Sequence, residues 1–261
     1  MESQVELVLR QDADNVATLT LNRPKARNAL SRPLMAALHA MLDTLHQDKS
    51  VHVIVIQGSG PGFCAGHDLK EVRGDTSAEF YQTLFAECSA LMQRIQSVRQ
   101  PVIAKVHGIA TAAGCQLVAT CDLAVAADTA RFATPGVNIG LFCSTPMVAL
   151  SRAVGRKQAM RMLLSGDMIP AAQALDIGLI SDLATEADLD ETTQALAKQI
   201  AAKSPLTLAI GKEAFYEQIQ MPVSAAYDYA SQVMCMNMAK RDAEEGIDAF
   251  IEKRDPVWRG E

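Results

Sequence analysis

The feature that most constrains the fold is the regular alternation of apolar and helix-like segments through residues 1–185. "VHVIVIQG" and "PVIAKVHG" are short apolar runs, typical of strands that are buried on both faces. Residues 77–98 between them have a helix-like pattern. This alternation indicates an α/β fold with a parallel sheet. After Ser144 the pattern is mostly helical, with "GLISDLA" as the only late strand, so we expect an α/β core followed by a helical C-terminal segment.

The amino-terminal segment predicts a pair of strands followed by the first helix. "VELVLR" and "VATLTLN" alternate apolar and polar residues, and the turn-rich "QDADN" joins them. Ser31 is the expected N-cap of the helix, because Pro33 follows it closely and suits the first helical turn. This helix should run to about Gln47.

The composition limits the classes of protein to which the chain can belong. Of the 261 residues, 49% are hydrophobic and 21% are charged, so the chain can bury a sizeable core. The net charge is −6 without long basic runs, and we therefore expect neither nucleic acid nor a membrane as a partner. The first residues resemble neither a signal peptide nor a transit peptide, which leads us to expect a cytoplasmic protein.

Three common kinds of site have little support in the sequence. The six cysteines are scattered without a metal-ligand spacing, so no metal is expected. Gly60, Gly62 and Ala65 match a dinucleotide fingerprint, but "GHDLKE" comes where an uninterrupted helix should already be running. A serine hydrolase is also disfavoured, because the chain has no G-x-S-x-G elbow.

Two stretches of small residues are better candidates for a site. "CAGHDLKE" and "HGIATAAGCQLVATCDLAVAAD" each place small residues where the chain turns into a helix. Free backbone N–H groups at such turns suit an oxyanion. Two such turns that converge would polarise a carbonyl group and stabilise an enolate.

These stretches carry a resemblance to a known family. Together with "FATPGVNIGLF", "RAVGRKQAMRMLLSGDMIPAAQALDIGLISDL" and "GIDAFIEKRDPVW", they resemble the enoyl-CoA hydratase/isomerase (crotonase) superfamily. "GHDLKE" and "GLFCSTP" are similar to its enoyl-CoA hydratase domain-containing protein 3-like branch. The resemblance implies an α/β fold of the ClpP/crotonase type, a spiral of ββα repeats in residues 1–200. It also implies that residues 201–261 form a helical trimerisation region that packs on the core and on neighbouring subunits.

The resemblance also implies the binding residues of the site. The oxyanion N–H groups would be those of His67 and Ala113, and the substrate would be an acyl-CoA thioester. No separate cofactor is implied, because coenzyme A is part of the substrate. The implied assembly is a homotrimer, or a homohexamer made of two trimers. The implied CoA contacts are Arg27, Ala65, Gly66, Asp68, Lys70 and Lys253.

The chain departs from the family at the two catalytic glutamates. Their positions are occupied by Gln116 and Gly136. Neither residue can take up or release a proton near neutral pH, so ordinary 2-enoyl-CoA hydration is expected to be weak. The expected protein is an acyl-CoA-processing lyase or isomerase that stabilises a thioester enolate. The alternatives are a catalytically silent acyl-CoA-binding or scaffold protein and a decarboxylase-type enolate reaction, with "GLFCSTP" as the apolar wall and Cys143 as one polar group in it.

Overall fold

A computed structural model describes residues 6–261 and contains a large, mostly parallel sheet. The strands follow the spatial order β1-β2-β3-β4-β6-β9, and β1 pairs with β2 in the antiparallel direction. They are β1 (Val8–Ala13), β2 (Val16–Leu21), β3 (Val53–Gly58), β4 (Val102–Val106), β6 (Leu123–Ala127) and β9 (Asp182–Ala184). The parallel pairing of β2, β3, β4, β6 and β9 confirms the expected α/β class.

A second, smaller sheet repeats the same progression along the chain. It contains β5 (Ile109–Thr111), β7 (Arg131–Ala133) and β8 (Ile169–Pro170). Single bridges between Leu30 and His67 and between Cys64 and Ala110 add extended segments to this progression. Each strand from β2 to β6 in the large sheet is thus followed by a short extended segment and then by a helix. This repetition confirms the spiral of ββα units.

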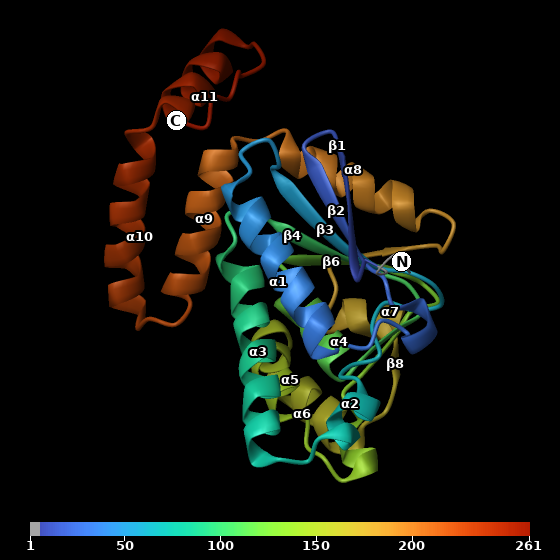
Figure 1. The fold of residues 1–261 in the computed structure, drawn as a ribbon. Helices are drawn as coiled ribbons and strands as arrows, with labels where there is room; N and C mark the ends of the chain where they lie inside the picture. Colours follow the sequence, from blue (N-terminus) through green and yellow to red (C-terminus); the bar gives the residue numbers. More distant parts are fainter. Residues whose placement is uncertain (1–5) are drawn as a thin grey trace.

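The helices lie on both faces of the large sheet. Figure 1 shows α1 and α3 on one face and α8 on the other. The α-helices are α1 (Arg32–Gln47), α2 (Leu69–Gly74), α3 (Ala78–Ser97), α4 (Ala113–Thr120), α5 (Ser144–Ala153), α6 (Arg156–Ser165), α7 (Ala171–Asp176), α8 (Leu189–Ala201), α9 (Pro205–Gln218), α10 (Val223–Met238) and α11 (Arg241–Glu252). Ser31 caps α1 as predicted, because its hydroxyl accepts from the Leu34 N–H.

Strand β3 explains why the central strands are apolar throughout. Ile54 and Ile56 belong to the large core cluster on the α1 and α3 side, and both are fully buried. Val53 and Val55 point the other way and pack in a second cluster with residues of α8. Because successive side chains in a strand point to opposite faces, a strand covered on both sides must be apolar at every position.

Two local predictions are corrected by the structure. Strand β1 runs to Ala13, so the reversal is confined to Asp14 and Asn15, whose φ angles are 52° and 61°. Asparagine and aspartate tolerate this left-handed conformation better than most residues, and it suits a tight hairpin. "GLISDLA" is also not the only late strand, because β8 pairs with β7 before it.

The C-terminal helices are joined to the core by a buried polar network. The Lys212 ammonium of α9 lies 2.7 Å from Asp122, which lies two residues after the end of α4. It also donates to the carbonyl oxygens of Ile95 and Gln100, at 2.9 Å each. The Tyr216 hydroxyl donates to the other Asp122 oxygen over 2.8 Å. Beyond α9, helices α10 and α11 extend away from the sheets (Figure 1).

Candidate active site

The two turns of small residues lie against each other. The Thr111 N–H donates to the Cys64 carbonyl oxygen over 3.0 Å. A Cβ on Gly66 would lie 2.9 Å from the Ala112 Cβ, and a Cβ on Gly114 would lie 2.1 Å from the Cys64 carbonyl oxygen. Distances this short exclude a side chain at either glycine unless the backbone moves. Close packing of the two turns therefore requires the small residues.

Two backbone N–H groups at this contact, those of His67 and Ala113, have no hydrogen-bond acceptor among residues 6–261. Leu30 donates to the Gly66 carbonyl and accepts from the Asp68 N–H, which leaves the His67 N–H on the opposite edge of this segment. Ala113 is the first residue of α4, where N–H groups have no partner within the helix. The two N–H groups form a candidate oxyanion hole.

Ala112 holds the second turn in a conformation that is unusual for a residue with a side chain. Its φ is 50° and its ψ is −117°, immediately before the first residue of α4. Its own N–H donates to the Ala133 carbonyl oxygen over 2.9 Å, which ties the turn to β7. Such conformations cost about 1–3 kcal/mol and tend to occur at functional sites. The sequence did not reveal this strain, because alanine is not a marker of positive φ.

Gln116 lies one helical turn after Ala113 and is 4% exposed. The thiol of Cys88, on α3, donates to its Oε1, with a sulfur–oxygen distance of 3.9 Å. Burial raises the pKa of Cys88 to about 11, so this thiol stays protonated at neutral pH. The Gln116 Nε2 has no acceptor among the described residues 6–261. Nothing in the sequence indicated this contact between Cys88 and Gln116.

Gly136 lies in a 3₁₀ turn, Pro135–Ile139, where a side chain does not fit. A Cβ there would lie 2.6 Å from the Leu141 carbonyl oxygen and 2.8 Å from the Cys143 sulfur. The Gly136 N–H donates to this sulfur over 3.3 Å. The Cys143 thiol thus occupies space into which a side chain at position 136 would point, and a glutamate at 136 would require the segment to move.

The His67 side chain turns towards α3 and is uncharged. Its ring meets the Phe85 ring edge-on, with 5.7 Å between the centroids. Neither ring nitrogen is exposed or has a partner of hydrogen-bond geometry within residues 6–261. Burial lowers the pKa of His67, and an opposing effect of the Leu30 backbone is smaller. The imidazole is therefore neutral at pH 7.

A family model described as "Enoyl-CoA hydratase/isomerase" matches residues 11–261. The chain belongs to the enoyl-CoA hydratase/isomerase family. The match covers both turns and the C-terminal helices, and it confirms the family resemblance seen in the sequence.

Curated relatives confirm the branch as well. Enoyl-CoA hydratase domain-containing protein 3, mitochondrial, of Rattus norvegicus is 47% identical over 98% of this chain and 86% of its own length. The human protein of the same name is 46% identical over 100% of this chain and 86% of its own length. The 2,3-dehydroadipyl-CoA hydratase of Escherichia coli (strain K12) is 37% identical over 97% of this chain and 98% of its own length.

Solved structures of the family have the same fold. An enoyl-CoA hydratase of Mycobacterium smegmatis matches with a TM-score of 0.95 and 51% identity, over 97% of this chain and 98% of that one. Human enoyl coenzyme A hydratase domain-containing protein 3 matches with a TM-score of 0.94 and 45% identity, over 97% of this chain and 100% of that one.

The comparisons contradict the cytoplasmic location expected from the sequence. The rat, mouse and human relatives are each named mitochondrial. The expectation rested on the charge and hydropathy of the first residues, and these properties alone do not determine the compartment. In residues 6–261, none of the helices is both long and apolar enough to span a bilayer.

The structure brings together most of the residues that the family resemblance implies for CoA. The Ala65 N–H donates to the Arg27 carbonyl oxygen over 3.0 Å, so the two backbones are adjacent. Asp68 caps α2 and pairs with Arg23 at 2.7 Å, and the Arg23 hydrogen bond helps to keep the pKa of Asp68 below its usual range. Its carboxylate is therefore already occupied by protein partners. Lys70 is exposed on α2, close in sequence to this cap.

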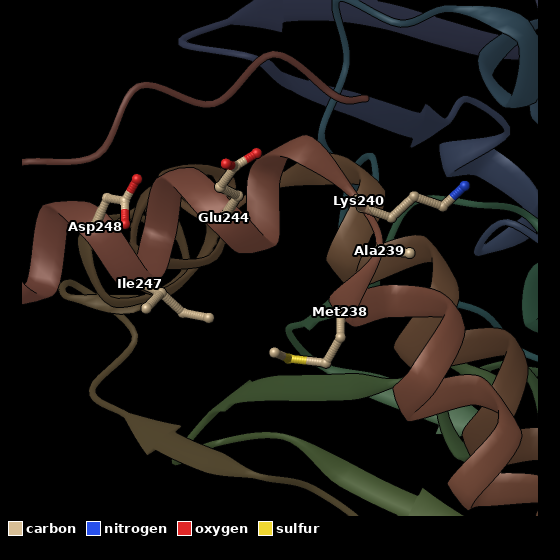
Figure 2. A pocket seen from close by; sticks show the side chains of 6 residues that line it. All are labelled: Met238, Ala239, Lys240, Glu244, Ile247 and Asp248. Atoms are coloured by element: carbon tan, nitrogen blue, oxygen red, sulfur yellow. The ribbon is translucent and has the colours of Figure 1, made fainter.

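Lys253 is separated from the other implied contacts within one chain. It is the C-cap of α11, with a φ of 58°, and Figure 1 shows α11 and α2 at opposite ends of the molecule. A hollow of about 390 Å³ lies near this end, and Met238 and Ile247 point into it from α10 and α11 (Figure 2). This hollow is not at the two turns. In the described part of the chain, no group of three or more metal-ligating side chains occurs.

Proposed function

We propose that this chain processes acyl-CoA thioesters by holding the thioester carbonyl oxygen between the N–H groups of His67 and Ala113. The pair of unpartnered N–H groups at the contact of the two turns is the observation that carries the proposal. Such donors stabilise the negative charge that develops on the oxygen as an enolate forms. In this arrangement the backbone of the two turns binds the thioester oxygen.

We further propose that the chain hydrates 2-enoyl-CoA thioesters slowly. Hydration needs one group that activates water and another that protonates the α-carbon. Gln116 cannot transfer a proton at neutral pH, and Gly136 has no side chain to do so. Each well-placed acid or base typically contributes about 10²–10⁴-fold to the rate, so the loss of both is large.

The test is to measure crotonyl-CoA hydration by the wild type and by Gln116→Glu. Glutamate has the shape of glutamine and fits the same space, so the variant should hydrate at least about tenfold faster than the wild type. Gln116→Met is the matched control, because it keeps the length of the side chain without a carboxylate, and it should show no gain. A second substitution at Gly136 is not useful, since the Leu141 carbonyl and Cys143 leave no room.

Two outcomes would contradict this proposal. One is hydration of crotonyl-CoA by the wild type at a rate within tenfold of the rate at which the Escherichia coli 2,3-dehydroadipyl-CoA hydratase turns over its own substrate. The other is failure of the wild type to bind any acyl-CoA thioester in a calorimetric titration. Binding without turnover across enoyl, malonyl-type and hydroxyacyl thioesters would identify a silent acyl-CoA-binding protein instead, and turnover of malonyl-type thioesters alone would identify a decarboxylase.

We also propose that residues 201–261 serve in assembly as a trimer or a hexamer. The support is a set of exposed apolar side chains on the C-terminal helices. These are Tyr227, Met234, Met236, Met238, Phe250 and Ile251. A monomer rarely leaves so many apolar residues exposed in one region. In such an assembly Lys253 would reach the CoA of a neighbouring subunit, together with Arg27 and Lys70 of that subunit.

A further inference from the structure

The Gln116 amide is a polar group of the candidate site that the oxyanion role does not use. It is nearly fully buried, and its Oε1 is engaged by the Cys88 thiol. Because the two ends of an amide diverge, the Nε2 hydrogens face away from Cys88. No protein group of residues 6–261 accepts from the Nε2, and this atom keeps some solvent-accessible surface, so a ligand or a water molecule can accept its hydrogen bond.

The Gln116 side chain and the Ala113 N–H lie on the same side of α4. Gln116 and Ala113 are three residues apart in α4, so they share one side of the helix. Side chains in an α-helix lean towards its N-terminus, which here is the end that carries the free Ala113 N–H. The Gln116 amide therefore lies on the same side as the place where a thioester oxygen would bind.

Helix α3 contacts both His67 and Gln116. Phe85 and Cys88 are one turn apart on α3 and therefore share a face. Phe85 contacts the His67 ring, and Cys88 contacts the Gln116 amide. All these groups are uncharged at neutral pH, since burial raises the pKa of Cys88 and lowers that of His67.

We propose that Gln116 selects 3-oxoacyl thioesters by donating an Nε2 hydrogen bond to their 3-oxo oxygen. The inference rests on the proposed function, in which the thioester oxygen occupies the His67 and Ala113 N–H groups. A 1,3-dicarbonyl has two acceptor oxygens and no donor of its own. The site offers two separate sets of N–H donors, and the Gln116 oxygen is already engaged. The His67 and Ala113 N–H groups would bind the thioester oxygen, and the Gln116 Nε2 would bind the 3-oxo oxygen.

The experiment is a calorimetric titration with butyryl-CoA and acetoacetyl-CoA, which have the same chain length and differ in the 3-oxo oxygen. The wild type should bind acetoacetyl-CoA about tenfold more tightly, the effect of one additional hydrogen bond. Gln116→Met should remove this preference, so that the ratio of the two affinities measured in the same variant falls to about one. Gln57→Met is the control, since Gln57 donates to Thr20 in the large sheet and should not affect the preference.

The outcomes separate this inference from the proposed function. Equal affinity of the wild type for the two thioesters, or a preference that persists in Gln116→Met, would overturn the role of Gln116 while butyryl-CoA binding still supports the proposed function. Malonyl-CoA should bind no more tightly than butyryl-CoA. If malonyl-CoA bound more tightly than acetoacetyl-CoA, the site would recognise a carboxylate instead. Failure to bind either thioester would overturn both proposals.

Discussion

The turns that form the candidate site and the helices α9–α11 are attached to the same core by different interactions. At the site, the close backbone contact of Gly114 with Cys64 leaves no space for an added methyl group. The C-terminal helices instead depend on a few buried polar groups, with Lys212 and Asp122 at one junction and Asp242 at another. We therefore expect added side-chain volume to destabilise the site, and the removal of a buried charge to destabilise the C-terminal region.

The second junction shows the same principle at the end of the chain. Asp242, at the start of α11, is 2% exposed and accepts from the Ser204 hydroxyl, which precedes α9. It also accepts from the backbone N–H groups of Arg259 and Gly260 in the terminal tail. Burial alone would raise the pKa of Asp242, but these donors outweigh burial and hold it below the usual value. One carboxylate thus joins three segments.

The largest expected effect is that of Asp122→Ala at the α9 junction. The change leaves the Lys212 ammonium, whose side chain is 6% exposed, without its counter-charge, and it removes the acceptor of Tyr216. Breaking a buried pair in this way costs about 3–5 kcal/mol, which urea unfolding would measure. Lys198→Ala in the exposed Lys198–Asp14 pair is the control, with an expected change under about 0.5 kcal/mol. A loss under about 1 kcal/mol in Asp122→Ala would mean that other contacts hold α9.

The next effect compares the same substitution in the two regions. Gly114→Ala should lower the free energy of unfolding by about 3 kcal/mol, because the added Cβ meets a backbone oxygen that cannot move freely. Gly211→Ala, in α9, adds a Cβ to open space and should raise it by about 0.5–1 kcal/mol through helix propensity. Urea unfolding of both variants tests the contrast. Equal effects at the two glycines would remove the distinction between the regions.

The smallest expected effect is a gain in stability at the site itself. Ala112→Gly should raise the free energy of unfolding by about 1 kcal/mol, because glycine adopts a φ of 50° without strain. The strain relieved exceeds the extra conformational entropy of glycine in the unfolded chain. The check is again urea unfolding, paired with acyl-CoA affinity. Lower stability in this variant would show that the Ala112 methyl group packs more favourably than its backbone is strained.

Much of the fold was predictable because it depends on local patterns. Apolar runs and helical spacing located the main strands and helices, and Ser31 marked the start of α1. Very short elements were harder to predict. Strand β8 contains two residues, too few for any periodic pattern, and it exists because it pairs with β7.

The site was predictable in its backbone and less so in its side chains. The small residues of the two turns predicted where free N–H groups would occur, and the family resemblance implied the roles of positions 116 and 136. The contact of Cys88 with Gln116 joins residues 28 positions apart, and the sequence has no signal for it. The sequence also has no signal for the contact of the Cys143 sulfur with Gly136. This contact depends on the path of the chain from the 3₁₀ turn to α5.

By itself the sequence determined the α/β class and the family, and it has glutamine at 116 and glycine at 136, the two positions where the family resemblance implies acids. These properties follow from residue identity and from patterns that extend over a few turns or strands. Only the tertiary structure decided that Gly136 has no room for a side chain, that Ala112 is strained and that Gln116 retains a free donor. Each of these facts depends on distances between segments that are remote in the sequence, and such distances arise only when the chain packs.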